Sequence, residues 1–297
     1  MSKVLFSRVH CWVIALVVVL TVFSMTAFAQ DSRDGNRVGN YVAKLQDPAK
    51  SEFNIPPKKK GEHPLMPALR WADNGLKQMN QNVKGYTAFL IKRERINGKL
   101  EPQQTLLVKV RHKPFSAYTK FLEPKNLAGQ EALYVQGANK GKMWAHSVGF
   151  QSAFGTVSLD PTNPFAMKGQ RYPITELGVQ NLVRRLIEVG LEDSKYGECE
   201  VKFLDNAKIN DRVCLCIQVM HPVPRKNFRF HLARIYVDKE LNVPIRYEAY
   251  DWPREKGGKP ELLEEYTYLK LKIRNDFTDA DFDPHNPDFK FDVKSDK

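Results

Sequence analysis

Short runs of β-branched and aromatic residues dominate the chain from residue 85 to residue 273. Neighbouring runs are joined by short turns, and Asn97-Gly98 is typical of a two-residue hairpin, because both turn positions need positive φ. Parallel strands would each need a crossover of a dozen or more residues, so the sheet is predicted to be antiparallel. The expected strands are 85–96, 100–112, 115–122, 130–136, 142–148, 200–208, 212–221, 227–237, 243–252 and 261–273.

Two segments have a helical period instead. Apolar residues recur at steps of three and four from Leu65 to Val83, and again from Val179 to Ile187, where Thr175 is the expected cap. A stretch rich in Gly, Pro and Asn, residues 154–173, is expected to be a loop. The order of helix, five strands, helix, five strands predicts an α+β fold, with a curved antiparallel half-barrel of about ten strands wrapped around two helices.

The first 64 residues lack both patterns. Lys3 and Arg8 precede the apolar run 12–20, and Ala27-Phe28-Ala29 has the small-x-small form of a signal peptidase site. The alternative is an uncleaved anchor, because residues 12–29 approach the length of about 20 that a spanning helix needs. Both readings place the protein in the periplasm or cell envelope. The predicted organisation is a signal peptide (1–29), a flexible basic linker (30–64), one half-barrel domain (65–291) and a tail (292–297).

Composition and charge limit the class of protein and the kinds of partner that are expected. The chain has 297 residues, is 42% hydrophobic and has a mean hydropathy of −0.47, which excludes disordered chains and polytopic membrane proteins. Its formal charge of +12 falls by two, to +10, when the signal is removed with Lys3 and Arg8. Export argues against nucleic acid as the partner. A basic exported protein meets an anionic membrane surface or acidic polysaccharide, and solubility alone is the other account of the charge.

Three cysteines remain after the signal: Cys199, Cys214 and Cys216. Cys199 faces Cys216 if the hairpin between them turns near residues 207 and 208, but not if it turns at residues 210 and 211. A disulfide from Cys199 to Cys216 or Cys214, and three buried free thiols, therefore both stay open.

Catalytic and metal-binding signals are weak. Glu264 and Glu265 are adjacent in a predicted strand and so point to opposite faces. No G-x-S-x-G elbow accompanies the histidines, and the cysteines lack C-x-x-C spacing. We predict no catalytic residue, no metal site and no cofactor.

Several stretches resemble an exported bacterial family, the domain of unknown function 1571. They include Gly85-Tyr86-Thr87-Ala88-Phe89, Lys113-Pro114-Phe115-Ser116-Ala117-Tyr118, the segment 236–248 and Asp281-Phe282-Asp283-Pro284. The same layout is more remotely similar to the outer-membrane lipoprotein carrier (LolA and LppX-like) half-barrel superfamily. That second resemblance implies an antiparallel half-barrel around helices that encloses an apolar cavity for acyl chains.

We therefore expect a non-enzymatic exported binding protein that holds a lipid, an acyl chain or a lipid-modified partner in an apolar cavity. The alternative is an envelope protein that binds acidic polysaccharide or an anionic membrane through a basic face. Strand position and residue type select these candidate cavity residues: Phe89, Ile91, Tyr134, Trp144, Tyr236, Tyr247 and Tyr266.

Overall fold

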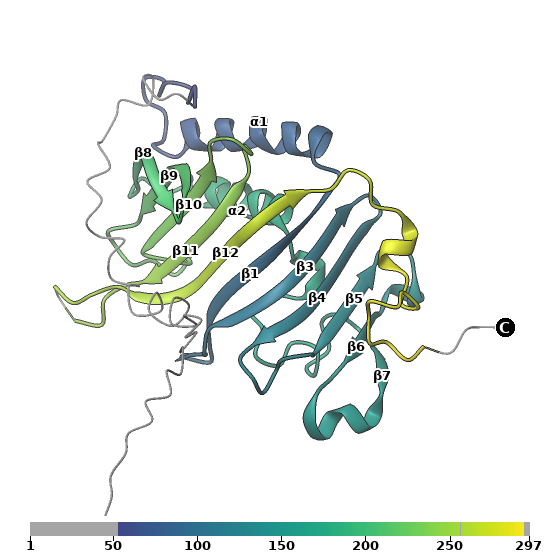
Figure 1. The fold of residues 1–297 in the computed structure, drawn as a ribbon. Helices are drawn as coiled ribbons and strands as arrows, with labels where there is room; N and C mark the ends of the chain where they lie inside the picture. Colours follow the sequence, from purple (N-terminus) through teal and green to yellow (C-terminus); the bar gives the residue numbers. More distant parts are fainter. Residues whose placement is uncertain (1–52, 256, 294–297) are drawn as a thin grey trace, which may run out of the picture. The chain divides into compact units, whose positions relative to one another are not determined.

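Figure 1 shows the computed structural model, which describes residues 53–255 and 257–293. These residues belong to one compact unit, Ala43–Lys297. The predicted signal peptide and the first part of the predicted linker lie outside the described residues. No helix in the described part is both long and apolar enough to span a membrane.

One antiparallel sheet of twelve strands forms the frame of this unit, as the alternating apolar pattern predicts. Its order is β7-β6-β5-β4-β3-β1-β12-β11-β10-β9-β8, with β2 paired only to β1. The first and last strands, β1 and β12, therefore meet in the middle and join the two halves. The strands are β1 Gly85–Ile96, β2 Lys99–Leu100, β3 Gln104–His112, β4 Phe115–Glu123, β5 Glu131–Val135, β6 Met143–His146, β7 Thr156–Leu159, β8 Glu200–Ile209, β9 Arg212–Met220, β10 Leu232–Asp238, β11 Pro244–Asp251 and β12 Glu261–Ile273.

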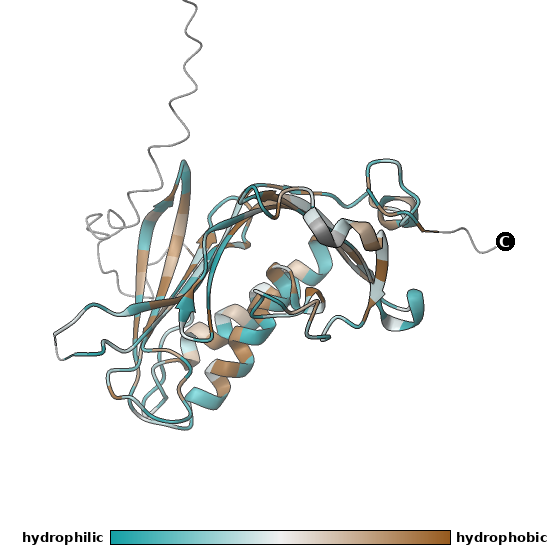
Figure 2. Ribbon diagram, turned by 90° about the horizontal axis from the view of Figure 1, so that it is seen from below, coloured by the Kyte–Doolittle hydropathy of each residue, from teal (hydrophilic) through white to brown (hydrophobic). Residues whose placement is uncertain are grey.

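Two helices lie on the concave side of this sheet, α1 (Met66–Asn82) and α2 (Val179–Asp193). Figure 2 shows the strands arching over them, and the apolar residues of both helices join the buried core of the sheet. The α+β half-barrel around two helices is thus confirmed. Short 3-10 turns complete the fold at Asn139–Gly141, Gly149–Phe154, Ile174–Glu176 and Asp279–Phe282.

The start of α2 differs from the prediction. Thr175 lies in a 3-10 turn and does not cap the helix, which begins after Gly178 without a side-chain cap. The backbone N–H of Val179 instead donates to the hydroxyl of Tyr86 on β1, at 3.0 Å. This hydroxyl is fully buried and satisfies one of the free donors at the helix N-terminus. A tertiary contact replaces the local cap that the sequence suggested.

The packed domain begins earlier than the boundary expected at Leu65. Ile55 is 2% exposed, and the ring of Phe53 packs edge-on against Trp71 of α1 with centroids 6.2 Å apart. Glu62 pairs with Arg70 of the same helix. The described part of the predicted linker therefore packs against α1.

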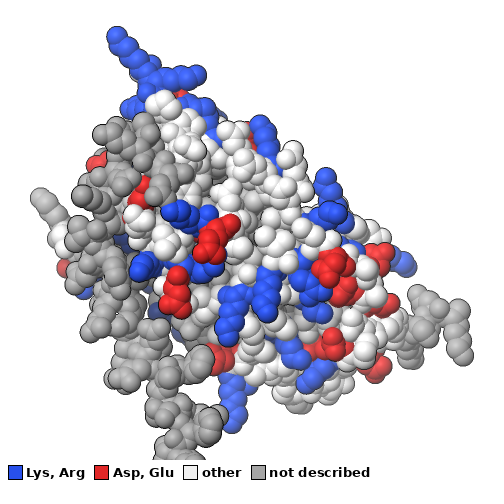
Figure 3. Space-filling view, turned by 45° about the horizontal axis from the view of Figure 1, so that its top comes forward, with Lys and Arg blue, Asp and Glu red and all other residues white. Residues whose placement is uncertain are grey.

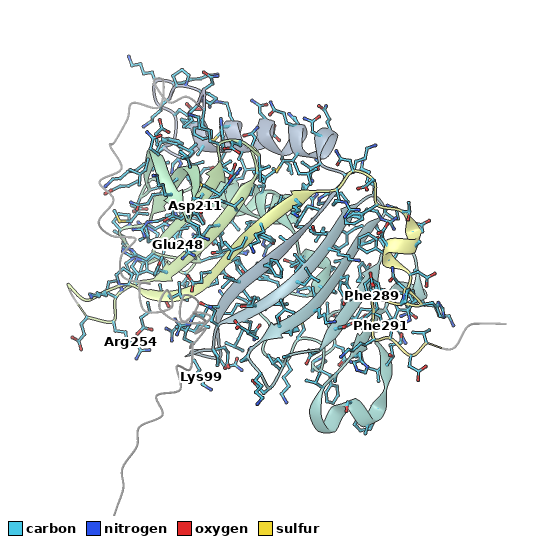
Figure 4. All side chains as sticks on the ribbon, viewed as in Figure 1. Lys99, Asp211, Glu248, Arg254, Phe289 and Phe291 are labelled. Carbon is cyan, nitrogen blue, oxygen red and sulfur yellow. The ribbon has the colours of Figure 1, made fainter. Side chains whose placement is uncertain are left out.

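The C-terminal residues pack against the convex face of the sheet. Phe289 stacks on Tyr118 of β4 with ring centroids 4.1 Å apart, and Phe291 meets the same ring edge-on. Figure 4 labels both phenylalanines beside β5 and β6. Glu131 of β5 is fully buried beneath this segment, where it accepts the backbone N–H of Lys290 at 2.9 Å. The segment covers the outer face over β4, β5 and β6.

A buried polar pair lies at the end of α2. Asp193, the last helical residue, is 2% exposed and lies 3.4 Å (Oδ2 to Nε2) from His221 after β9. The His221 ring stacks on Phe228 at 3.9 Å, and its Nδ1 is 3.1 Å from the carbonyl oxygen of Phe230. That carbonyl can only accept, so Nδ1 carries the proton and Nε2 presents a lone pair toward Asp193.

A crowded glycine at the start of β1 gives a stability prediction. A Cβ on Gly85 would lie 2.7 Å from both the Phe277 ring and the carbonyl oxygen of Val110, so Gly85→Ala is expected to cost about 1–3 kcal/mol. Gly75 in α1 has open space around its Cβ position, and Gly75→Ala should instead stabilise the protein by about 0.5–1 kcal/mol. Urea unfolding of both variants measures this. Equal effects of the two substitutions would contradict the packing described at Gly85.

Candidate functional site

A cavity of about 960 Å³ lies between the concave face of the sheet and α2. Strands from both halves of the sheet contribute to its wall, and the chain from residue 154 to residue 178 borders it on the other side. Most of the wall is apolar: Leu90, Leu106, Phe121, Met143, Val157, Leu182, Leu186 and Val189. A smaller cavity of about 100 Å³ lies between the two helices and strands β9 and β10.

Alternation along β1 explains how the first strand faces this cavity. Tyr86, Ala88 and Leu90 are buried on the concave side, whereas the alternate residues Phe89 and Ile91 point to the convex side. The paired strand β12 has a bulge opposite Ala88, where two of its residues face one residue of β1. Lys270 in this bulge has a φ of +51°.

A cluster of charged and phenolic groups interrupts the apolar wall. Lys92 Nζ of β1 is 2.9 Å from Glu94 Oε2, and both side chains are almost completely buried. On β12, Glu264 Oε2 is 2.9 Å from the Nε of Arg171, which belongs to the bordering segment 154–178. The hydroxyl of Tyr266 donates to Glu94 and lies 3.4 Å from Glu264 Oε2, so it joins the two ion pairs.

The bordering segment is tied to the sheet through this cluster. Lys92 donates to the side-chain oxygen of Gln170, and the hydroxyl of Tyr172 donates to Glu264 at 3.2 Å. The backbone N–H of Arg171 reaches Glu94 at 3.3 Å. Three consecutive residues therefore fix the segment against β1 and β12, across one side of the cavity.

Burial controls the protonation of these groups. Loss of water raises the pKa of the Glu264 carboxyl, and Arg171 and the phenols of Tyr172 and Tyr266 oppose that rise. Burial, together with the nearby carboxylate of Glu264, also raises the pKa of Tyr172 to about 12 and that of Tyr266 well above its ordinary value. The phenols are therefore neutral hydrogen-bond donors at physiological pH.

Two of the seven predicted cavity residues line the large cavity, Tyr247 of β11 and Tyr266 of β12. The ring of Phe89 instead lies 5.9 Å from Lys270 Nζ on the convex face, which Ile91 shares. Tyr134 packs against Phe115, with centroids 6.2 Å apart, outside the cavity.

The remaining two also point away from the cavity. Trp144 lies between Met143 and Ala145, which line the cavity, and packs into the convex cluster around Tyr118. Tyr236 alternates with the inward-facing Ile235 and Val237, and its hydroxyl donates to Glu248 at 3.3 Å.

The convex face near Tyr236 has an ion-pair network of its own. Glu248, labelled in Figure 4, is 1% exposed and receives Arg234 at 3.1 Å and Arg246 at 2.8 Å. Arg246 also reaches Glu265 at 2.8 Å. These groups satisfy one another across β10, β11 and β12, so we assign them a structural role.

Cys199, Cys214 and Cys216 are three separate buried thiols, so of the two alternatives that the sequence left open the possible disulfide is wrong and the free thiols are confirmed. Cys216 pairs with Leu204, and Cys214 pairs with Ala207 beyond a bulge, so neither faces Cys199. Cys199 immediately precedes Glu200, which is opposite Met220. Burial raises the pKa of all three thiols to about 12 and leaves them protonated.

Neither the charges on the face shown in Figure 3 nor the metal-ligating side chains of the described residues indicate a second site. On the face shown in Figure 3, basic and acidic side chains are interspersed and do not gather into one basic patch. Within residues 53–255 and 257–293, no group of three or more His, Cys, Asp or Glu side chains is placed to hold a metal ion.

A comparison with known protein families shows which family this chain belongs to. The model of a protein family of unknown function, DUF1571, matches residues 83–291. The chain belongs to the DUF1571 family. The match covers all twelve strands and α2, and therefore the sheet and helix that enclose the cavity. No curated protein matches the sequence.

Several solved structures are similar to this DUF1571 chain in fold. LppX, a lipoprotein of Mycobacterium tuberculosis, is 11% identical with a TM-score of 0.39, over 70% of this chain and 100% of LppX. A LolA superfamily protein of Nitrosomonas europaea is 12% identical with a TM-score of 0.30, over 71% of this chain and 97% of that one. An uncharacterised conserved protein of Thermus thermophilus is 11% identical with a TM-score of 0.40, over 72% and 92%.

Proposed function

We propose that this protein is an exported, non-enzymatic binding protein that holds a lipid, an acyl chain or the acyl chain of a lipid-modified partner in the large cavity. The cavity carries the proposal. Its volume of about 960 Å³ is near the upper end of ordinary ligand sites, and apolar side chains form most of its wall. Each buried methylene of an acyl chain contributes about 0.8 kcal/mol in such surroundings.

The polar cluster supports binding rather than catalysis. Glu94 and Glu264 are each held by a cation and a phenol, so neither is an unpaired base. The buried thiols are protonated and lie outside the cavity wall. The periplasm or cell envelope remains the location expected from the N-terminal sequence.

Filling the cavity tests this proposal. Ala145 of β6 lines the cavity, and Ala145→Trp is expected to weaken binding of a fluorescent fatty acid by about tenfold or more, because the indole takes the space of several methylenes. Ala280→Trp is the matched control, since Ala280 is exposed and outside the cavity wall. Fluorescence titration of both purified proteins measures the difference.

The wild-type protein should also release acyl-chain compounds on solvent extraction, detectable by mass spectrometry, and the Ala145→Trp variant should release fewer. Absence of both a co-purified acyl compound and fatty-acid binding by the wild type would overturn the proposed function. Equal binding by the Ala145→Trp and Ala280→Trp variants would place the ligand outside this cavity.

A further inference from the structure

Two phenylalanine side chains stand in solvent at the rim of the large cavity. Phe154 is 71% exposed and Phe165 is 77% exposed, yet both contribute to the cavity wall. A side chain can line the cavity and also be exposed to solvent only where the cavity opens. The rings of Phe154 and Phe165 therefore lie at its mouth. The other exposed large apolar side chains in the described residues reach 47% at most. Of these, Tyr172, at 36%, borders the cavity, and three others do not: Leu122, Leu191 and Val223.

Charge at the mouth differs from charge inside. Each buried charged group of the wall has an oppositely charged partner, as in the pair of Lys92 and Glu94. The exposed charged groups of the wall are three basic and one acidic, which leaves an excess of two positive charges: Lys168, Arg185, Arg229 and Glu176. Within the described residues, Lys168 and Arg229 have no carboxylate within 4.0 Å.

We propose that this rim docks on the surface of an anionic lipid bilayer, with Phe154 and Phe165 entering the interfacial layer and Lys168 and Arg229 facing the lipid headgroups. The inference rests on the proposed function, because it gives the bound lipid a route between membrane and cavity. Aromatic rings with basic neighbours are the composition that binds membrane interfaces.

The arrangement favours a bilayer over a protein partner. A stable protein interface needs a continuous, well-packed apolar core, in which charged residues are depleted. Here the two rings come from separate places, the 3-10 turn Gly149–Phe154 and the loop after β7, and basic side chains share the rim with them. A fluid bilayer can take up separate aromatic side chains, because its lipids pack around each ring individually.

The test is flotation of the purified exported protein with phosphatidylcholine vesicles, with and without phosphatidylglycerol. The wild type should float with the anionic vesicles and far less with the neutral ones. The pair Phe154→Ser and Phe165→Ser should reduce flotation by about tenfold or more, and so should Lys168→Ala with Arg229→Ala. Matched controls remove exposed apolar or basic side chains elsewhere and should float like the wild type: Leu122→Ser with Val223→Ser, and Lys125→Ala with Lys208→Ala.

A vesicle-free titration with the fluorescent fatty acid separates this inference from the proposed function. The rim variants should keep a cooperative urea unfolding transition like that of the wild type, which shows that they fold. If the wild type binds the fatty acid but does not float, or if the rim variants float like their controls, membrane docking is overturned. Failure of the wild type to bind the fatty acid counts instead against the proposed function.

Discussion

Replacing Glu94 with alanine is expected to lower the free energy of unfolding by about 3 kcal/mol. Lys92 is 6% exposed, and its ammonium group has Glu94 as its carboxylate partner at 2.9 Å. Without that carboxylate the charge stays buried beside an apolar wall, and Tyr266 and Arg171 also lose an acceptor. Urea unfolding of Glu94→Ala against the wild type measures the loss.

A surface pair provides the control for this prediction. Glu101 lies 3.9 Å from the exposed Lys99, and Glu101→Ala should cost less than about 1 kcal/mol, because water screens that pair. The double variant Lys92→Met with Glu94→Leu should recover much of the lost stability, since no buried charge then remains unpaired. Equal costs for Glu94→Ala and Glu101→Ala would mean that water reaches Lys92 through the cavity.

The frame of this fold follows from sequence pattern. The predicted strands 85–96 and 261–273 coincide with β1 and β12, because their apolar alternation and bounding turns are clear. The expected turn at Asn97-Gly98 is present, with φ of 49° and 80°. The structure has twelve strands where about ten were expected, since the predicted loop 154–173 contains β7 and the two-residue β2 precedes β3.

The hydrophobic pattern of β1 does not show which face of the strand lines the cavity. Phe89 and Ile91 are more apolar than Lys92 and Glu94, so the pattern assigned the cavity to the wrong face of the strand. The inner face is polar there because Lys92 and Glu94 satisfy each other and bind the segment from Gln170 to Tyr172. Such pairing depends on long-range contacts that periodicity does not record.

The rest of the site lies in residues 154–173, whose composition predicts a loop. Arg171 and Tyr172 complete the polar cluster, and Phe154 and Phe165 form the rim. The Gly, Pro and Asn content of residues 154–173 correctly predicts a loop over most of this stretch. It does not indicate which strands or helix the loop covers. Two large aromatics in a Gly- and Pro-rich stretch were the available signal, since such residues are seldom needed to make a turn.

Replacing Asp193 with asparagine is expected to stabilise the protein at neutral pH. Burial raises the pKa of Asp193 from 3.8 to about 6, with Arg229 opposing the rise and Glu192 adding to it. The lone pair of His221 Nε2 faces the carboxyl, and burial lowers the pKa of that imidazole. The protonated acid can donate to Nε2, whereas the carboxylate only repels it, and neither Nε2 nor Oδ2 has another hydrogen-bond partner among the described residues.

The sign of the pH dependence follows from this raised pKa. The folded state binds the Asp193 proton more tightly than the unfolded state, so its stabilisation is complete below about pH 4 and is lost as pH rises through about 6. A rise in the pKa of Asp193 from 3.8 to about 6 corresponds to about 3 kcal/mol. An asparagine side chain does not titrate, so the Asp193→Asn variant should gain up to about 3 kcal/mol over the wild type at pH 7.5 and little at pH 4.

Urea unfolding of wild type and variant across this pH range measures the difference. Glu192→Gln is the matched control, because Glu192 precedes Asp193 on the same helix but is exposed, where it pairs with Lys195. That variant should follow the wild-type curve within about 0.5 kcal/mol. A gain for Asp193→Asn that does not grow with pH would show that the effect comes from packing and not from the titration of Asp193.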